Sequence, residues 1–229
     1  MTLTLYMHPL ASFCHKVLIA LFENDTRFIA ETVDLGDTGS TAAHLERWPV
    51  GKMPVLHASA NDTTIPETSI IIEYLDRHYP GPSPMLPQDP DTCLQVRLWD
   101  RFFDLYVSTP MQTIVGDRLR PEGHKDPRGV DSACATLDTA YGMIEKQVSA
   151  DGWAADKSFS MADCSAAPAL FFASIVHPFD EKHTNLAAYF DRLMGRPSVE
   201  RVIAEARPFF PMFPYSEAIP PRFLAENER

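Results

Sequence analysis

The chain has 229 residues, 45% hydrophobic and 22% charged, which is enough for one large domain or two small ones with their own cores. Its 20 Lys and Arg against 31 Asp and Glu give a formal net charge of −11, which disfavours nucleic acid or an anionic membrane as a non-specific partner. The N-terminus lacks the pattern of a signal peptide, and no apolar stretch is long enough to span a bilayer. We therefore expect a globular, cytoplasmic protein.

The four cysteines are scattered along the chain, at Cys14, Cys93, Cys134 and Cys164. Their spacing matches neither a zinc site nor a dense disulfide framework. Reduced thiols and no bound metal are the expectation, and only Cys14 falls near a candidate site.

The first eighty residues alternate between the two-residue period of strands and the 3.6-residue period of helices. Residues 2–6 predict a strand, and the apolar residues from Ser12 to about Asn24 predict a helix. A strand, a short helix or irregular connection, two short strands and a helix are expected to follow over residues 27–33, 41–48, 54–56, 63–65 and 68–79. The order β-α-β-α-β-β-α predicts a small α/β layer.

Five prolines from Pro80 to Pro90 interrupt regular structure and indicate a domain boundary. We place a first domain over residues 1–80, a linker over 81–90 and a second domain over 91–229. Helical patterns predict that the second domain is all-α, with helices over residues 91–118, 130–149, 161–176, 185–195 and 198–206. The tail from Pro208 is rich in proline and aromatic residues and is expected to be an extended segment lying over the folded body.

Ser12 and Cys14 fall where the first strand turns into the first helix. A helix N-terminus offers free N–H groups and a positive dipole end that stabilise a thiolate, and a hydroxyl there can donate one further hydrogen bond. Ser12 can equally cap the helix. Cys14 is either a nucleophile with a lowered pKa or a buried residue, and Ala11 stands where a Cys-x-x-Cys pair would need its first thiol.

A proline enters a strand pattern in the segment GKMPVL. A cis Met53–Pro54 bond would explain it and would leave the backbone groups of Met53 free to pair with an extended peptide. An ordinary edge-strand proline is the alternative.

At the start of the last predicted helix of the α/β layer, Glu67 and Thr68 bring together a carboxylate, a hydroxyl and free N–H groups. Such a set can hold an amino-acid head group, with Glu67 on its ammonium. Simple capping by Thr68 or Ser69 is an equally good account.

These motifs, in this order, resemble the cytosolic glutathione transferase superfamily, in particular its bacterial-type, serine-type members. The resemblance covers essentially the whole chain, including PETSIIIEYLD, the proline-rich linker and the capping-box segment FSMADCSAAPAL. It implies a thioredoxin-like α/β domain joined to an all-α helical domain, usually as a homodimer. It also implies glutathione as co-substrate and a small hydrophobic electrophile as its acceptor.

The resemblance assigns residues to each part of glutathione. Glu67 and Thr68 would hold its γ-glutamyl end, and Lys52 would reach its glycyl carboxylate. Met53 would pair backbone groups with the cysteinyl unit beside Pro54.

Ser12 is the residue expected to activate the glutathione sulfur. Serine-type relatives carry this hydroxyl at the position of Ala11, one residue earlier than in this chain. Tyrosine-type relatives place theirs near Tyr6, which is the second candidate, and Cys14 is the third. Cysteine-type relatives place the thiol at the Ala11 position, which argues against a mixed disulfide at Cys14.

The acceptor is expected between the domains, bordered by Leu10, Phe103, Tyr106 and Met111. Phe103 and Tyr106 belong to an aromatic stripe that can equally be core. Two other functions stay open: a glutathione-dependent thiol reductase or peroxidase, and a non-catalytic protein that binds glutathione or hydrophobic ligands.

Overall fold

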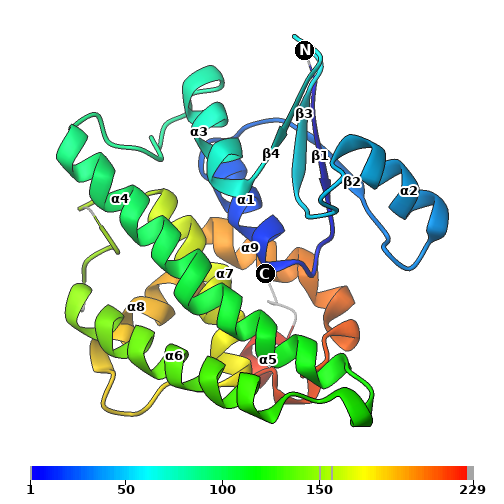
Figure 1. Ribbon diagram of the computed structural model, residues 1–229. Helices are drawn as coiled ribbons and strands as arrows, with labels where there is room; N and C mark the ends of the chain where they lie inside the picture. The colour runs from blue at the N-terminus through cyan, green and yellow to red at the C-terminus, as the bar shows by residue number, and fades with distance from the viewer. Residues whose placement is uncertain (1, 150, 156, 226–229) are drawn as a thin grey trace.

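The computed structural model describes residues 2–149, 151–155 and 157–225, which form an α/β layer followed by a bundle of helices (Figure 1). The elements of the layer are β1 (Leu3–Met7), α1 (Ser12–Glu23), β2 (Ile29–Thr32), α2 (Thr38–Arg47), β3 (Val55–Ala58), β4 (Thr63–Pro66) and α3 (Thr68–His78). Their order is the predicted one, so the thioredoxin-like fold class is confirmed.

The sheet has the strand order β2-β1-β3-β4. Strand β1 runs parallel to β2, with Leu5 opposite Ala30, and antiparallel to β3, with Leu5 opposite Leu56. Side chains on β1 alternate between buried and half-buried, as the sequence pattern requires. Because β1 is central and leads directly into α1, the start of α1 is held at one end of the sheet.

The second half of the described chain contains α4 (Pro90–Phe102), α5 (Thr109–Leu119), α6 (Pro127–Gln147), α7 (Met161–Val176), α8 (Thr184–Met194) and α9 (Pro197–Ala206). Helix α7 lies in the centre, buried along almost its whole length and in contact with both α1 and α4. Its start has the expected structural role: Asp163 Oδ2 accepts from the Ser160 N–H at 2.9 Å, and Asp163 Oδ1 accepts from the Tyr189 hydroxyl at 2.6 Å.

Two predictions for the helical half need correction. The single helix expected over residues 91–118 contains a π-helical segment, Phe103–Ser108, between α4 and α5. The tail is not extended but forms 3₁₀ turns over Arg207–Met212, Ser216–Ala218 and Pro221–Phe223. Its prolines have a backbone φ compatible with such turns, and its aromatic rings still pack on the body, as Phe210 and Phe223 do on Phe171.

The segment between α3 and α4 contains no helix or strand, as its prolines predicted. It is tied to the α/β layer by Asn24, whose Oδ1 accepts from the Ser83 N–H at 2.9 Å, and by close packing of Gly81 on Asn24. None of the described helices has the length and apolar character needed to cross a membrane.

Candidate active site

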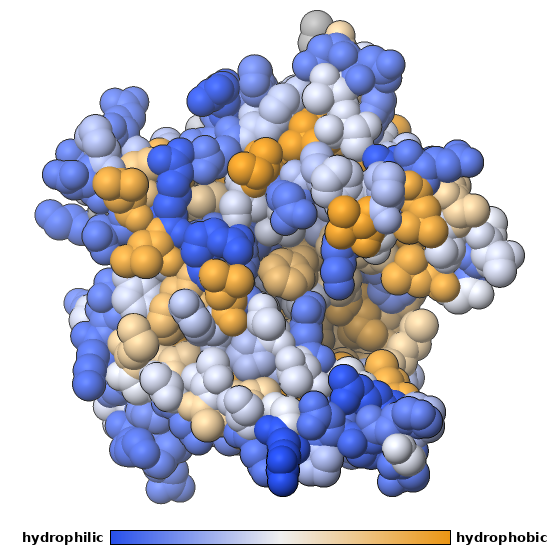
Figure 2. Space-filling view, in the orientation of Figure 1, coloured by the Kyte–Doolittle hydropathy of each residue, from blue (hydrophilic) through white to orange (hydrophobic). Residues whose placement is uncertain are grey.

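A cleft of about 480 Å³ lies between the α/β layer and the helical bundle, where the space-filling view shows a hollow between the two lobes (Figure 2). Its walls come from the starts of α1 and α3, the loop before β3, and the run from α4 to α5. The residues predicted for glutathione lie together in this wall: Ser12, Lys52, Met53, Pro54, Glu67 and Thr68. Segments far apart in the sequence thus converge on one cavity.

Ser12 is the first residue of α1, and Ala11 occupies the N-cap position. The Ser12 side chain therefore does not cap the helix, and its hydroxyl makes no hydrogen bond with any described residue. Although only 8% exposed, Ser12 lines the cleft. It thus presents an uncommitted hydroxyl beside the positive end of a helix dipole.

The Met53–Pro54 peptide bond is cis, as predicted. Gly51 has a φ of 70°, a left-handed conformation that favours glycine, and the buried His44 bonds the Lys52 carbonyl at 3.1 Å from Nε2. Within the described chain the backbone N–H and C=O of Met53 make no hydrogen bond. These groups are therefore available to an extended ligand.

Glu67 is the N-cap of α3 and has a φ of 68°, which is uncommon for a residue with a side chain. Neither it nor Thr68 caps the helix through its side chain, and the Ser69 hydroxyl turns inward to Lys16. The capping alternative considered from the sequence is thus not the arrangement found. Backbone strain of this kind occurs preferentially at binding and catalytic sites.

A buried ionic cluster beneath the cleft joins the two halves of the molecule. Lys16, on α1, is 1% exposed and places its Nζ 2.7 Å from Asp100 Oδ1, 2.9 Å from Asp104 Oδ2 and 3.0 Å from Ser69 Oγ. Burial raises the pKa of Asp104, while the Lys16 ammonium acts in the opposite direction. Asp104 and Arg101 also line the cleft.

This cluster was not predicted from the sequence. A lysine inside the apolar stripe of α1, together with two aspartates four residues apart, one on α4 and one in the π-helical segment, was the signal that could have found it.

A second cavity of about 340 Å³ adjoins the cleft and shares Ala11, Ser12 and Gln112 with it. Two of the predicted acceptor residues, Leu10 and Met111, line it. The remaining lining is mostly apolar and comes from α5, α7 and the tail: Val115, Gly116, Leu119, Phe172, Met212, Phe213 and Pro214. Gln112 was not singled out from the sequence, because nothing in its surroundings there marks it.

The other two predicted acceptor residues lie outside both cavities. Phe103 is fully buried and packs against Trp99 and Phe102. Tyr106 is half exposed, and its ring packs at a tilt against Phe102, with ring centres 5.3 Å apart. The aromatic stripe is thus mainly core, since Trp99, Phe102 and Phe103 are all buried.

The two alternative catalytic residues also lie outside these cavities. Cys14 is fully buried, and burial raises the pKa of its thiol to about 12, so the thiol stays protonated at neutral pH. The Arg47 guanidinium lies over the ring of Tyr6, and its carbon Cζ is 4.1 Å from the centre of that ring. Of the three candidates, only Ser12 lines the cleft and the second cavity.

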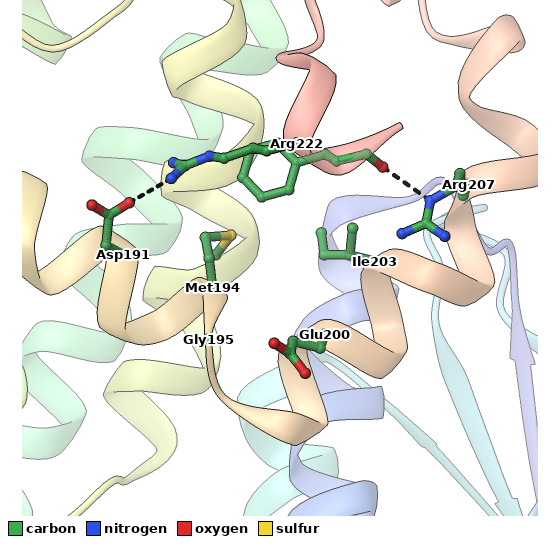
Figure 3. A pocket seen from close by; sticks show the side chains of 8 residues that line it. Asp191, Met194, Gly195, Glu200, Ile203, Arg207 and Arg222 are labelled. Atoms are coloured by element: carbon green, nitrogen blue, oxygen red, sulfur yellow. Dashed lines mark hydrogen bonds and ion pairs between the residues drawn. The ribbon is translucent and has the colours of Figure 1, made fainter. Parts of the chain in front are cut away.

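A separate cavity of about 270 Å³ lies between α8, α9 and the tail (Figure 3). Two arginines border it, and both fix the tail: Arg222 pairs with Asp191 at 2.8 Å, and Arg207 Nε donates to the Phe223 carbonyl at 3.0 Å. It contains none of the predicted site residues, most of which line the cleft or the second cavity instead. No group of three or more potential metal ligands occurs within residues 2–149, 151–155 and 157–225.

Comparison with known proteins agrees with this geometry. Residues 5–83 match the family of glutathione S-transferase N-terminal domains, and residues 124–192 match the corresponding C-terminal domain family. A glutathione S-transferase-like protein of Aspergillus aculeatus is 25% identical over 196 residues, 81% of this chain and 89% of that protein.

Two solved structures are also similar. A glutathione S-transferase from Methylobacterium radiotolerans, in complex with glutathione sulfonate, is 25% identical and superposes with a TM-score of 0.75 over 88% of this chain and 94% of its own. A glutathione transferase from Phanerochaete chrysosporium, with oxidized glutathione, is 20% identical with a TM-score of 0.81 over 92% and 97%. With both domain families matched in order, the chain belongs to the glutathione S-transferase superfamily.

Proposed function

We propose that this protein is a glutathione transferase that activates the glutathione thiol at Ser12 for attack on a small apolar electrophile. The observation that carries the proposal is the position of Ser12, whose uncommitted hydroxyl stands at the start of α1 and borders both cavities. A sulfur placed there would face the cleft that holds the tripeptide and the apolar cavity that holds the acceptor.

Activation means stabilising the thiolate. A cysteinyl thiol with a pKa of about 8.5 is mostly protonated at neutral pH, and only the thiolate attacks well. Lowering this pKa by about two units needs about 2.7 kcal/mol of selective stabilisation of the anion. A hydroxyl donor and a helix N-terminus together can supply that amount.

The rest of the cleft would bind the tripeptide in an extended form. The free backbone groups of Met53, beside the cis Pro54, suit its cysteinyl unit. Glu67 and Thr68, at the uncapped start of α3, suit its γ-glutamyl head group. Lys52 is exposed at the rim, where its ammonium can meet the glycyl carboxylate.

The acceptor would occupy the second cavity, lined by Leu10 and Met111. Because no charged side chain from the described residues lines this cavity, it favours a neutral acceptor with an apolar body. The Gln112 carboxamide can offer a hydrogen bond at the junction with the cleft.

The buried, protonated Cys14 supports conjugation over a thiol-reductase function, because a reductase needs an accessible thiolate. The four cysteines form no disulfide in the described structure, which suits a reducing compartment such as the cytoplasm.

A homodimer is also part of the proposal. Apolar side chains gather over α3, α4 and the π-helical segment (Figure 2): Ile70, Leu94, Leu98, Leu105 and Tyr106, each 46–59% exposed. Figure 2 shows these apolar groups separated by hydrophilic side chains, and several large exposed apolar side chains on neighbouring elements suit a subunit interface.

Ultraviolet titration of the thiolate of bound glutathione tests the proposal. The wild type is expected to bind glutathione with a thiol pKa about two units below 8.5. Ser12→Ala should raise this pKa and reduce turnover while nearly preserving glutathione affinity, and Cys14→Ala should behave as wild type. Unchanged pKa and turnover in Ser12→Ala would remove Ser12 from the mechanism. Loss of activity in Cys14→Ala with retention in Ser12→Ala would favour the reductase.

A further inference from the structure

An ion pair from the helical domain, Arg101 with Asp104, faces the same cleft as Glu67 and Thr68. Arg101 Nη1 lies 3.0 Å from Asp104 Oδ2. The Lys16 ammonium bonds both Asp104 Oδ2 and the Ser69 hydroxyl, at 2.9 and 3.0 Å. A shared bonding partner therefore places the Asp104 carboxylate beside the first turn of α3.

This pair keeps binding capacity for a ligand. The bonds that Asp104 makes through its side chain with other described residues all end on Oδ2, and the ion pair uses Nη1 of Arg101. Oδ1 of the carboxylate and the remaining guanidinium N–H groups are thus uncommitted in that part of the chain. Arg101 is 52% exposed in its side chain, so the guanidinium is accessible from the cleft.

An α-amino acid head group matches such a pair chemically. It carries an ammonium and a carboxylate on one carbon, and the protein offers a carboxylate and a guanidinium side by side. Hydrogen bonds between ionised groups are shorter and stronger than those between neutral groups. An ammonium also has three donors, so Glu67 alone leaves part of its capacity unused.

We infer that Arg101 and Asp104 complete the subsite for the γ-glutamyl head group. Arg101 binds the α-carboxylate together with Thr68, and Asp104 binds the ammonium together with Glu67. The inference rests on the proposed function and adds the helical domain to a subsite that the sequence analysis placed in the α/β layer alone. Lys16 is a positioning residue, because it holds Asp104 against α3.

A site with this arrangement requires a complete head group. A site that binds only the cysteinyl and glycyl units of the tripeptide has no such requirement. With Arg101 and Asp104 in place, the site demands both a free ammonium and a free α-carboxylate. A tripeptide without the α-carboxylate loses the contact with Arg101, and a tripeptide without the ammonium loses the contact with Asp104.

Isothermal titration calorimetry on the full chain tests the inference with three peptides. These are glutathione, γ-aminobutyryl-Cys-Gly, which lacks the α-carboxylate, and glutaryl-Cys-Gly, which lacks the ammonium. The wild type is expected to bind glutathione about tenfold more tightly than either analogue, the size of one charged hydrogen bond. Arg101→Gln should weaken glutathione about tenfold yet leave the affinity for γ-aminobutyryl-Cys-Gly unchanged.

Asp104→Asn should show the complementary pattern, with loss for glutathione and no change for glutaryl-Cys-Gly. Arg77→Gln is the matched control, since it makes the same charge change on an exposed arginine at the far end of α3 and should alter none of the three affinities. Thermal unfolding checks that each variant is folded. If Asp104→Asn does not fold, Arg101→Gln decides alone, because removing this exposed guanidinium leaves Asp104 still paired with Lys16.

Two results would overturn the inference while leaving the proposed function intact. One is unchanged glutathione affinity in Arg101→Gln, and the other is an equal loss for all three peptides, which indicates a general structural effect. A wild type that binds none of the three peptides would instead contradict the proposed function itself, and the inference with it.

Discussion

The two cavities that meet at Ser12 are built in different ways. The cleft is lined by charged side chains and free backbone groups above the buried Lys16 cluster, whose members come from both domains. The second cavity is lined by apolar side chains, several at the surface, such as Leu119 and Met212 with 69% and 65% exposure. The buried cluster therefore holds the geometry of the cleft, where the tripeptide is proposed to bind. The shape of the second cavity, proposed for the acceptor, depends on a wall that the tail supplies.

The tail is attached to the helical domain partly by contacts at the surface, unlike the buried cluster beneath the cleft. Tyr215 stacks under the Arg118 guanidinium at 4.1 Å, and Arg118 also pairs with Glu217 at 2.5 Å. Both contacts are near the surface, where ion pairs contribute little to stability. Changes at these two contacts can thus reshape the acceptor cavity at small cost to the fold, and changes in the buried cluster cannot.

The largest effect is expected for Lys16→Met, which removes the cation paired with the buried Asp100 and leaves Asp104 with Arg101 alone. The free energy of unfolding should fall by about 3–5 kcal/mol, measured by urea denaturation. Lys146→Met, an exposed lysine on α6, is the control and should change it by less than about 0.5 kcal/mol. A Lys16→Met protein as stable as wild type would show that the cluster does not fix the cleft.

A pH effect is expected from His15, whose Nε2 lies 2.5 Å from the carbonyl oxygen of Pro9 beneath the loop that carries Leu10. Burial lowers its pKa from 6.5 to about 4, so the folded state favours the neutral ring. This stability is complete above about pH 6.5 and is lost as the pH falls towards 4, by about 3 kcal/mol in total. Urea denaturation of wild type and His15→Gln across this range measures it. Parallel pH profiles for the two proteins would contradict the assignment.

Glu67→Ala separates the two cavities functionally. We expect the dissociation constant for glutathione to rise about tenfold, because a carboxylate partner of the ammonium is lost. The KM for the acceptor at saturating glutathione should stay unchanged. Glu181→Ala, in an exposed turn, serves as control. Normal glutathione affinity in Glu67→Ala would place the γ-glutamyl end elsewhere.

The smallest effect is expected for Phe213→Ala in the tail wall. Phe213 is buried and packs edge-on against Phe172, and its removal should raise the KM for an apolar acceptor about three- to tenfold. The affinity for glutathione should remain within about twofold. Steady-state kinetics with varied acceptor measures the first quantity and calorimetry the second. An equal loss on both sides would mean that the two cavities are not independent.

Much of the fold could be predicted from the sequence, because hydrophobic periodicity and proline placement are local signals. The order of the α/β layer, the break after α3 and the helix Met161–Val176 all follow from them. The π-helical segment could not be predicted in this way, since it depends on how Phe103 and Asp104 pack against neighbouring helices. The prediction that Phe103 and Tyr106 line the acceptor site relied on a regular helix.

The site was predictable only where ligand groups lie at helix starts or beside a proline. Ser12, Met53, Glu67 and Thr68 belong to this kind. Whether Ser12 caps α1 or keeps a free hydroxyl depends on Ala11 taking the N-cap position, which propensity does not anticipate. Three further residues line the cavities from positions more than thirty residues after Thr68 in the sequence: Arg101, Asp104 and Gln112. Only tertiary packing reveals them.

A crystal structure with glutathione bound tests the central claim most directly, through the distance from the glutathione sulfur to the side chains around it. The account predicts that the sulfur lies within about 3.2 Å of Ser12 Oγ and faces the cavity lined by Leu10 and Met111. A sulfur that accepts a hydrogen bond from the Tyr6 hydroxyl, or that forms a disulfide with Cys14, would contradict it.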